Sequence, residues 1–572
     1  MVTLTIDGKR VSVEPGTTVL AAAQWLGIRI PTMCHVPGIE PAAACFVCAV
    51  QIEGRRTLSP ACAVPVAEGM AVSTNSDDVR TARKMALELL LSDHAGECVA
   101  PCAARCPAGL DIPGFVHGIA TGDHRRATEV IAERLALPGS LGRICPRLCE
   151  EGCRRCDLDQ GLAIGALHRY AADLDIAAAA PYTPPRAPAS GKQVAIVGAG
   201  PAGLAAAWYL LRKGHACTLY DAHPQPGGML RYGIPAYRLP KEALDAEIGA
   251  IEKLGARFQM GMRWGAEFTL GELRKQYDAV FLAIGAQRAE GLRCEGEQHA
   301  LSGIEFLELV AKGKPPALGR DVVVVGGGNT AMDCARSAAR LGARVRILYR
   351  RGRQEMPCAM HEVEAAEAEG VHIDLLVAPV RLDGRAGRPV LLLTCRRMTL
   401  GEPDASGRRR PCAVEGSDFI IECSTVIAAI GQAVERTLPG REGLRVTGWG
   451  IAVDERTLAT NLPGVFAGGD AVLGADLAVR AVAAGRIAAT SIHQYLSGEP
   501  VTGEPEMTGI VMRPVDDAER AAIFRAIEKA ARVPIPRIPM EQRLATFDEV
   551  ELGLPLEEAA REARRCLSCG CR

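Results

Sequence analysis

Two glycine-rich segments, each placed directly after a run of β-branched apolar residues, constrain the fold of this chain more than any other feature. The first spans Val194–Gly203 (VAIVGAGPAG) and the second spans Val322–Ala331 (VVVVGGGNTA). A buried parallel strand that opens through glycines into a helix brings backbone N–H groups at the helix N-terminus close to a pyrophosphate. The sequence therefore predicts two Rossmann-like dinucleotide-binding domains of the α/β class.

The first segment has its features in the order that a dinucleotide site requires. Gly198 is expected to form the tight turn, Gly200 to let the backbone approach the pyrophosphate, and Gly203 to let helix and strand pack closely. A second strand, Ala216–Tyr220, is followed by Asp221, whose carboxylate can accept a hydrogen bond from a ribose 2′-hydroxyl. Strand, glycines, helix and acid together predict a nucleotide site.

The second segment differs at the residues that follow its second strand. The strand Arg344–Leu348 leads into Tyr349, Arg350 and Arg351 rather than into an acid. A carboxylate there would repel a ribose 2′-phosphate, whereas a guanidinium group binds phosphate through two hydrogen bonds. The difference favours NADP over NAD. An alternative interpretation is that Arg350, Arg351 and Arg353 only form a solvated basic turn.

The distribution of cysteines indicates metal sites. The chain has 572 residues and 21 cysteines, of which 14 lie in the first 156 or the last seven residues. The N-terminal segment 1–7 lacks the basic and apolar regions of a secretory signal, so we expect a cytoplasmic location. Clustered thiols in a reducing compartment favour metal over disulfides. The remaining cysteines stand singly and are expected to be packed or surface residues: Cys217, Cys294, Cys334, Cys358, Cys395, Cys412 and Cys423.

Residues 1–75 are predicted to form a small β-grasp ferredoxin-like domain. Val2–Ile6 and Val11–Val13 flank an Asp-Gly hairpin turn, and Val19–Leu26 follows as a helix. The next four cysteines can surround one [2Fe-2S] cluster: Cys34, Cys45, Cys48 and Cys62. The gap of ten residues between the first two resembles the ferredoxin domain of the large iron-sulfur subunit of complex I and of related hydrogenases and formate dehydrogenases. A zinc site is the alternative.

Residues 76–175 are predicted to form a helical domain that holds two [4Fe-4S] clusters. We expect helices over 76–91, 112–120 and 126–137. Short cysteine spacings, with proline directly after two of the cysteines, are typical of [4Fe-4S] ligation. The cysteines of this region are Cys98, Cys102, Cys106, Cys145, Cys149, Cys153 and Cys156.

A third segment, Thr460–Asp470, ends a strand with glycines and an acid. The order GAGPAG, PGGMLRYGIPAYRLP, GGGNTAMD, YRR and VFAGGD resembles the small subunit of bacterial glutamate synthase and the flavin half of dihydropyrimidine dehydrogenase, over residues 95 to 495. In that family the first and last motifs hold FAD, and the middle motif, on a domain inserted into the first, holds NADPH. The resemblance implies FAD contacts from Gly198, Gly200, Pro201, Ala202, Gly203, Asp221, Gly228, Met229, Leu230, Arg238, Gly469 and Asp470. It implies NADP contacts from Gly327, Gly328, Asn329, Thr330, Arg350 and Arg351.

The same resemblance implies how the cluster ligands divide. One cluster takes Cys106, Cys145 and Cys149 with His168, which falls where the family has Gln or Glu. The other takes Cys98, Cys102 and Cys153 with a fourth ligand that stays open between Cys156, His94 and a C-terminal cysteine. The tail 562–570 (EARRCLSCG) resembles the segment that in the family precedes the first cluster cysteines. It could fold back onto that cluster, serve a partner subunit, or be an idle terminus; its cysteines are Cys566, Cys569 and Cys571.

The predicted organisation is discontinuous. The FAD-binding domain is expected over 192–290 and 425–495, with the NADP-binding domain over 291–424 between the two halves. Strands at 279–284 and 425–430 are expected at the crossing points. A linker over 176–191 precedes this pair of domains, and a C-terminal extension over 496–572, with helices at 517–531 and 556–565, follows it.

These features predict an FAD-dependent NAD(P)H oxidoreductase subunit. Electrons are expected to pass between NADP(H), FAD, two [4Fe-4S] clusters, one [2Fe-2S] cluster and a partner of 2-oxoacid oxidoreductase, formate dehydrogenase, glutamate synthase or hydrogenase type. Positioning alone serves hydride transfer, so no catalytic side chain is predicted. A net charge of −1 gives no case for nucleic acid, and no apolar stretch suits a bilayer. The alternatives are a stand-alone reductase of ferredoxin or another acceptor, and a non-catalytic relay or assembly subunit.

Overall fold

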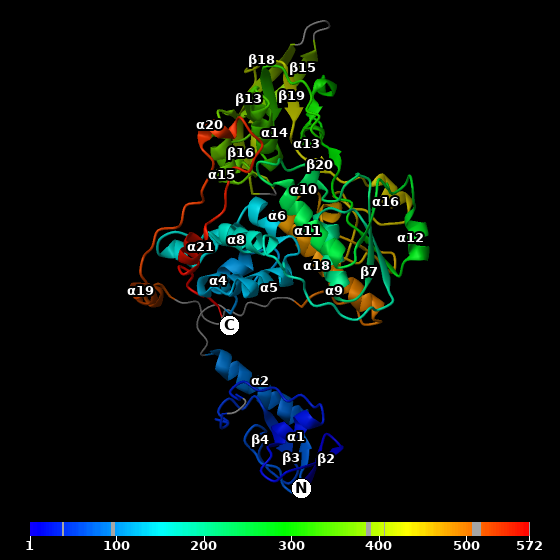
Figure 1. Ribbon diagram of the computed structural model, residues 1–572, viewed down its shortest axis with the longest axis vertical. Coiled ribbons are helices and arrows are strands. Elements are labelled where there is room, and N and C mark those ends of the chain that lie inside the picture. Colours follow the sequence, from blue (N-terminus) through cyan, green and yellow to red (C-terminus); the bar gives the residue numbers. More distant parts are fainter. Residues whose placement is uncertain (37–38, 93–97, 385–389, 405–406, 506–515, 571–572) are drawn as a thin grey trace. The chain divides into compact units, whose positions relative to one another are not determined.

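The computed structural model describes residues 1–36, 39–92, 98–384, 390–404, 407–505 and 516–570. The chain divides into two compact units (Figure 1). The first consists of the described residues of Met1–Cys98 and Gly509–Ile527, with Gly570, and the second of those of Val99–Thr508 and Glu528–Cys569. Among the helices of these residues, none is long and apolar enough to cross a membrane.

The first unit contains a five-stranded sheet in the order β2-β1-β5-β3-β4. Its strands are β1 (Val2–Ile6), β2 (Lys9–Val13), β3 (Ala49–Ile52), β4 (Ser59–Pro60) and β5 (Ala71–Ser73). The predicted hairpin is confirmed, since β1 and β2 pair antiparallel across the Asp-Gly turn. Helix α1 (Val19–Trp25) begins where Thr18 Oγ1 accepts a hydrogen bond from Ala21 N. Helix α2 (Asp77–Ser92) follows the sheet, as its amphipathic pattern predicts.

The second unit is built on two parallel five-stranded sheets. The first has the order β21-β9-β6-β7-β8. Its strands are β6 (Gln193–Val197), β7 (Ala216–Asp221), β8 (Arg257–Met260), β9 (Ala279–Leu282) and β21 (Val465–Ala467). Helices α9 (Pro201–Arg212) and α18 (Ala478–Leu496) pack against each other beside it, and α10 (Met229–Tyr232), α11 (Lys241–Lys253), α12 (Leu270–Gln276) and α17 (Asp470–Leu473) complete this part.

The second parallel sheet lies between β9 and β21 in the sequence, with the order β11-β19-β12-β13-β14. Its strands are β11 (Leu301–Ser302), β12 (Asp321–Val325), β13 (Arg344–Tyr349), β14 (His372–Leu375) and β19 (Thr425–Ala428). Its helices are α13 (Gly303–Ala311), α14 (Asn329–Arg340) and α15 (Met360–Ala368). The two chain segments that connect the sheets run side by side, because β10 (Arg288–Ala289) pairs antiparallel with β20 (Gln432–Ala433). The predicted insertion of one Rossmann-like fold into another is thus confirmed.

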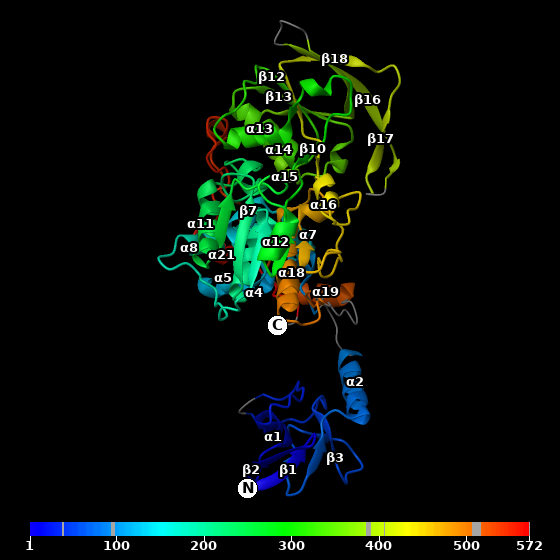
Figure 2. The same ribbon diagram turned by 90° about the vertical axis from the view of Figure 1, so that its right-hand side faces the viewer.

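An antiparallel sheet that the sequence analysis does not anticipate covers one face of the inserted sheet (Figure 2). It is formed by β15 (Val377–Gly384), β16 (Leu391–Pro403), β17 (Arg409–Ala413) and β18 (Phe419–Cys423). Side chains of β15 and β16 share a buried core with Val323, Val325 and Leu348 of the parallel sheet. The alternation of more buried and more exposed residues along β16 and β18 is typical of such a one-sided sheet.

The helical region contains α3 (Pro101–Arg105), α4 (Ile112–Thr121), α5 (His124–Arg134), α6 (Pro138–Ile144), α7 (Leu148–Glu151) and α8 (Ile164–Ile176). The helix predicted over 126–137 is displaced. It begins at His124, because Asp123 accepts a hydrogen bond from Arg126 N, and it ends at Arg134 before the proline that opens α6. The helix predicted over 112–120 is confirmed.

The C-terminal extension contains α19 (Asp517–Arg525), α20 (Met540–Arg543) and α21 (Leu556–Ala563). The helix predicted over 517–531 ends six residues early, at Arg525. The reason lies in competing contacts: Glu528 O accepts a hydrogen bond from Arg155, and Ala530 N donates to Asp159. These backbone groups bind the loop after α7 instead of continuing the helix.

Candidate functional site

A cavity of about 710 Å³ lies at the carboxyl ends of the two parallel sheets. This is the place where open α/β sheets bind nucleotides. Of the predicted FAD and NADP contacts, the cavity is lined by Gly198, Gly200, Pro201, Ala202, Asp221, Gly228, Met229, Leu230, Arg238, Asn329, Thr330 and Asp470. The predicted FAD and NADP contacts that do not line it are Gly203, Gly469, Gly327, Gly328, Arg350 and Arg351.

The first glycine loop has the geometry that its sequence predicts. Gly198 has a φ of 108°, and a Cβ there would overlap the carbonyl of Ala283. A Cβ on Gly203 would overlap the carbonyl of Gly198, so helix α9 touches the loop directly. Gly200, in contrast, faces open space, since only Gly228 Cα, at 3.8 Å, lies within 4 Å of its Cβ position. The backbone at the N-terminus of α9 is therefore accessible to a pyrophosphate.

Asp221 reaches the cavity but is already engaged with the backbone. Its carboxylate accepts hydrogen bonds of 2.8 Å from Ala199 N, inside the glycine loop, and of 2.8 Å from His223 N. The imidazole of His223 stacks on Tyr232 with the ring centroids 4.4 Å apart. A carboxylate has further acceptor capacity, so Asp221 can orient the loop and still bind a ribose hydroxyl.

Arg238 joins the two nucleotide-binding parts. Its guanidinium lies 2.8 Å from Asp333 on α14 and 3.0 Å from Glu362 on α15, and all three side chains are largely buried. Burial opposes the charged form, but the two carboxylates outweigh it and raise the pKa of Arg238. Arg238 therefore lines the cavity while it ties the first sheet's segment to the inserted domain.

Asp470 opens helix α17 and faces the cavity from the side of β21. Burial raises the pKa of its carboxyl to about 7. The following long helix α18 begins at Ala478, after Leu477 at its N-cap, as the apolar pattern predicts. The preceding residue, Gly469, lies against Ala202 in the first turn of α9, so Asp470 stands beside the N-terminus of that helix.

The second glycine loop repeats the first. Gly326 has a φ of 147°, and a Cβ on it would overlap the carbonyl of Ala429. At Gly328, which caps α14, only Pro357, at 3.9 Å, lies near the Cβ position. Asn329 and Thr330 follow at the first turn of α14 and line the cavity. This helix N-terminus is as accessible to phosphate as that of α9.

The two arginines after β13 differ in their surroundings. Arg351 is buried, donates to the carbonyl of Arg409 at 2.8 Å and pairs with Asp404 at 2.7 Å. Arg350 is exposed. Partial loss of hydration and the like charges of Arg351, Arg293 and Arg408 lower the pKa of Arg350. A bound phosphate would offset this like-charge crowding, so Arg350 fits a 2′-phosphate better than Arg351 does.

The first unit brings its four predicted cysteines together. Cys62 is buried, and its pKa is raised to about 12 by burial, by a hydrogen bond with Cys48 and by the charges of Cys48, Cys34 and Cys45. Backbone and side-chain hydrogen bonds from Cys45 lower the pKa of Cys34. Four mutually interacting thiols on one loop system fit the ligand set of one [2Fe-2S] cluster.

In the second unit, one set of neighbouring cysteines reaches the large cavity. Cys145, with its neighbours Ile144 and Pro146, lines the wall of that cavity. Burial raises the pKa of Cys145 to about 11, and the charge of Cys106 adds to the effect. Burial, Glu150 and the thiols of Cys145 and Cys106 raise the pKa of Cys149.

His168 lies on α8 and is buried. Burial lowers its pKa to about 4, which keeps the imidazole neutral. Within the described part of the chain its Nε2 atom is buried and makes no hydrogen bond. A neutral imidazole nitrogen without a polar partner fits a metal ligand.

A second set of neighbouring cysteines includes Cys102. Burial raises the pKa of Cys102 to about 12, with contributions from Cys153, Cys566 and Cys569. Cys156 is exposed, and its thiol donates to Glu150 O at 3.5 Å. Cys98 is the last residue of the first unit, and His94 and Cys571 lie outside the described residues. From the sequence, a tail cysteine is only one of three alternatives for the fourth ligand of this cluster.

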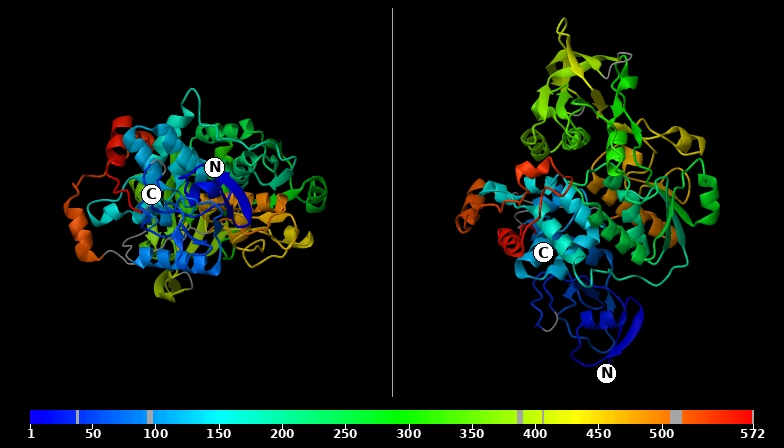
Figure 3. Two further views of the ribbon diagram at one scale, coloured as in Figure 1. Left: turned by 90° about the horizontal axis from the view of Figure 1, so that it is seen from below. Right: turned by 45° about the horizontal axis from the view of Figure 1, so that its top comes forward.

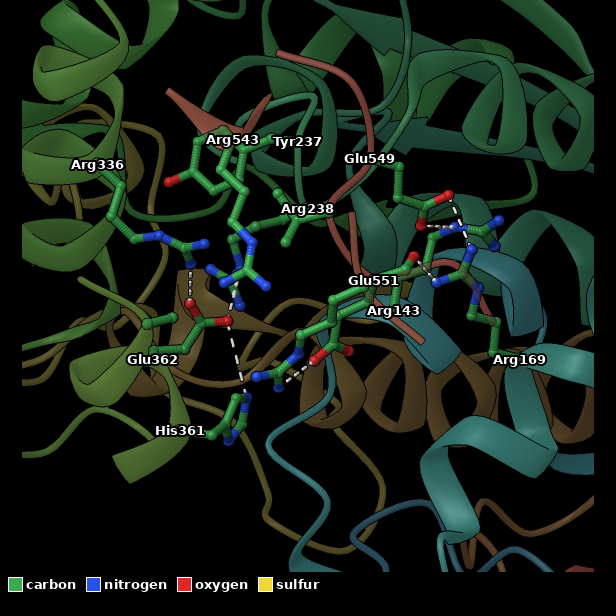
Figure 4. A pocket seen from close by; sticks show the side chains of 13 residues that line it. Arg143, Arg169, Tyr237, Arg238, Arg336, His361, Glu362, Arg543, Glu549 and Glu551 are labelled. Atoms are coloured by element: carbon green, nitrogen blue, oxygen red, sulfur yellow. Dashed lines mark hydrogen bonds and ion pairs between the residues drawn. The ribbon is translucent and has the colours of Figure 1, made fainter. Parts of the chain in front are cut away.

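A second, small cavity of about 40 Å³ lies where four segments of the second unit meet (Figure 4). We call it the ion-pair junction. Arg143 and Arg169 of α6 and α8 pair with Glu549 at 2.8 Å each, and Arg147 pairs with Glu551 at 2.7 Å. The other walls carry Tyr237, Arg238, Arg336, His361, Glu362, Arg537 and Arg543. The junction is too small for a nucleotide, and sequence reasoning did not find it.

Comparison with known proteins agrees with this arrangement. Residues 192–485 match the family model of pyridine nucleotide-disulphide oxidoreductases, which covers more than half of the chain. The chain belongs to this family. Residues 1–77 of this oxidoreductase match a 2Fe-2S iron-sulfur cluster binding domain, and residues 81–180 match the 4Fe-4S domain II of dihydropyrimidine dehydrogenase.

Three relatives cover most of this pyridine nucleotide-disulphide oxidoreductase. The beta subunit of an NADP(+)-dependent formate dehydrogenase of Moorella thermoacetica is 43% identical over 506 residues, which are 82% of this chain and 70% of the relative. The beta subunit of an NADPH-Fe(3+) oxidoreductase of Geobacter sulfurreducens is 39% identical over 504 residues, 82% of this chain and 75% of the relative. The small chain of an NADPH glutamate synthase of Azospirillum brasilense is 37% identical over 430 residues, which are 71% of this chain and 88% of the relative. The resemblance to glutamate synthase is confirmed, and the chain is an FAD-dependent NADPH oxidoreductase with iron-sulfur domains.

Proposed function

We propose that this oxidoreductase is the NADPH-linked electron-transfer subunit of a larger enzyme. The observation that carries the proposal is the shared cavity, whose wall includes the first glycine loop, the start of α14 and Cys145. Nucleotide-binding backbone and a cluster-type thiol therefore face one cavity. When bound, a flavin converts the electron pair of a nicotinamide into single electrons, which iron-sulfur clusters accept one at a time.

The residues of the chain serve this reaction by positioning. The N-termini of α9 and α14 bind the two pyrophosphates, and the Arg238–Asp333 pair, at 2.8 Å, holds the two nucleotide-binding parts together. Ile144 and Pro146 line the cavity on either side of Cys145. No side chain needs to donate or accept a proton for hydride transfer, so we assign no catalytic residue.

We assign the cofactor contacts as the sequence predicts, with one refinement. FAD is held by the first glycine loop with Asp221, Gly228 and Asp470, and NADP by the second glycine loop with Asn329 and Thr330. Arg350 binds the 2′-phosphate, while Arg351 holds the turn in place through Asp404. One [2Fe-2S] and two [4Fe-4S] clusters complete the set. One of the [4Fe-4S] clusters is bound by Cys106, Cys145, Cys149 and His168.

The partner carries the second half of the reaction. The relatives are named as subunits of formate dehydrogenase, Fe(3+) oxidoreductase and glutamate synthase. We propose a cytoplasmic complex in which a different, catalytic subunit oxidises or reduces an organic acid or another acceptor. We keep the domain divisions that the sequence predicts, with the FAD-binding part over 192–290 and 425–495.

Anaerobic purification of the untagged complex from its native cells tests the proposal. We expect a second chain to co-purify with a stoichiometric flavin, and NADPH to bleach the flavin rapidly. Elution of the chain alone, with full NADPH activity toward a free ferredoxin, would show a stand-alone reductase. A flavin that NADPH does not reduce would show a non-catalytic relay subunit.

A further inference from the structure

Two cysteines of the C-terminal tail, Cys566 and Cys569, lie outside every matched domain. The matched ranges end at residue 485, and the cluster-domain match ends at residue 180. The tail nevertheless belongs to the same compact unit as the cluster domain. What holds it there decides whether its thiols can act as ligands.

Helix α21 fixes the tail onto the cluster domain. It packs against α4 and α8, and Figures 1 and 3 show it beside these helices. Glu562 is fully buried, and its carboxylate accepts hydrogen bonds from Ala163 N at 2.8 Å and from Val533 N at 2.9 Å. A buried carboxylate is stable only when its acceptor oxygens are satisfied, so the end of α21 has one position on this surface.

Arg565 fixes the residue directly before Cys566. Its side chain is only 3% exposed and pairs with Glu562 at 2.7 Å and with Asp159 at 3.0 Å. It also donates to the carbonyl of Gln160 at 2.6 Å. Asp159 and Gln160 stand in the loop that follows Cys153. The chain therefore enters its last turn against the segment that carries this cluster cysteine.

The thiols themselves converge. Cys566 and Cys569 pack against the same buried core as Cys102 and Cys153. Cys102 lies within electrostatic reach of the other three thiols. In the described residues, no three His, Cys, Asp or Glu side chains close on one point as a single ion requires. A [4Fe-4S] cluster takes four cysteine thiolates, and Cys102 with these three neighbouring thiols matches that number.

We propose that Cys566 and Cys569 complete, with Cys102 and Cys153, the four thiolate ligands of the second [4Fe-4S] cluster. Cys156, which is exposed, is not a ligand of this cluster. The proposal rests on the proposed function only in that a cluster occupies this region. It follows that the cluster and the C-terminal tail stabilise each other, since the cluster binds both ends of the second unit.

The test compares the double variant Cys566→Ser/Cys569→Ser with Cys156→Ser as its matched control, in the full chain purified anaerobically. We expect the double variant to lose about four iron and about four sulfide per bound FAD, together with one EPR signal of the reduced protein. The control keeps the wild-type content. Wild-type iron in the double variant, or loss of a cluster in the control, overturns the proposal.

Alkylation of the wild-type protein covers the case in which the double variant does not fold. Iodoacetamide should label Cys156 in the native protein, and label Cys566 and Cys569 only after the clusters are stripped. Equal labelling of all three before stripping contradicts the proposal. Bleaching of the flavin by NADPH is a separate readout of the proposed function. If NADPH does not bleach the flavin but the double variant still loses iron, the proposed function is wrong and the ligand assignment holds.

Discussion

The two parallel sheets of the second unit share one scaffold and differ at one edge. Both have five strands, a glycine loop with positive φ at its first glycine, and an open helix N-terminus. The first ends its second strand in Asp221, which hydrogen-bonds into the glycine loop. The second strand of the other sheet ends at Tyr349 and is followed by Arg350, which lies near other arginines. We therefore propose that the shared scaffold binds the pyrophosphate and that the residue at the end of the second strand selects the ribose.

The largest expected effect comes from substitutions in the two glycine loops, which should differ in the nucleotide that is lost. Gly198→Val should abolish FAD binding, because its side chain would overlap the Ala283 carbonyl at a φ of 108°. Gly326→Val should leave FAD bound and abolish reduction of the flavin by NADPH. Flavin content and anaerobic NADPH titration measure both. Gly249→Ala, on α11 with open space at its Cβ position, is the control and should keep both properties. FAD retained in full by Gly198→Val would contradict the assignment.

The next effect concerns the edge at which the sheets differ. Arg350→Gln should lower kcat/KM for NADPH by about 10- to 100-fold, the range of a charge-assisted hydrogen bond. The value for NADH should stay unchanged. Arg353→Gln is the matched control, since Arg353 pairs with Glu367 at 2.6 Å and should have little effect. Equal loss with both nucleotides would show that Arg350 supports the fold instead of the 2′-phosphate.

The ion-pair junction contrasts with the large cavity, because paired charges fill it. Glu551→Gln should destabilise the second unit by about 2–3 kcal/mol at neutral pH, since it removes the carboxylate that pairs with the largely buried Arg147 at 2.7 Å. Burial opposes ionisation of Glu551, but Arg147 and Arg537 lower its pKa to about 2 from an ordinary value of 4.5. Its contribution is therefore present above pH 4.5 and lost as pH falls toward 2. Thermal midpoints of the two proteins should converge over that range, and a constant difference would refute the account.

Replacement of Glu247 is expected to change the stability less than replacement of Glu551 and in the opposite direction, because it should stabilise the protein. It accepts hydrogen bonds from Gly139 N and Ser140 N at the start of α6, the helix that leads to Cys145. Burial raises its pKa to about 7, above the ordinary value of 4.5. The stability that it contributes is full below pH 4.5 and is lost as pH rises through about 7. Glu247→Gln should therefore gain roughly 1–2 kcal/mol relative to wild type between pH 5 and pH 8. Parallel thermal midpoints across this range would contradict the linkage.

The sequence predicts the parts that depend on neighbouring residues. Glycine loops, their strands and the ferredoxin hairpin are local, because a turn with positive φ or a close helix approach marks its own residues. The contacts that close the sites are not local. Arg351 pairs with Asp404, Arg238 pairs with Asp333, and the tail packs beside Cys102, each across a long stretch of sequence. Such pairings follow from tertiary packing, which no spacing of residues records.

The central claim is that electrons from NADPH pass through the flavin into the clusters of the same chain. Rapid anaerobic mixing of the isolated chain with NADPH, frozen at successive times for EPR and followed in parallel by absorbance, tests it most directly. We predict that the flavin absorbance falls first and that signals of reduced iron-sulfur clusters then rise in the same molecules. Full bleaching of the flavin with no cluster signal at any time would contradict the account.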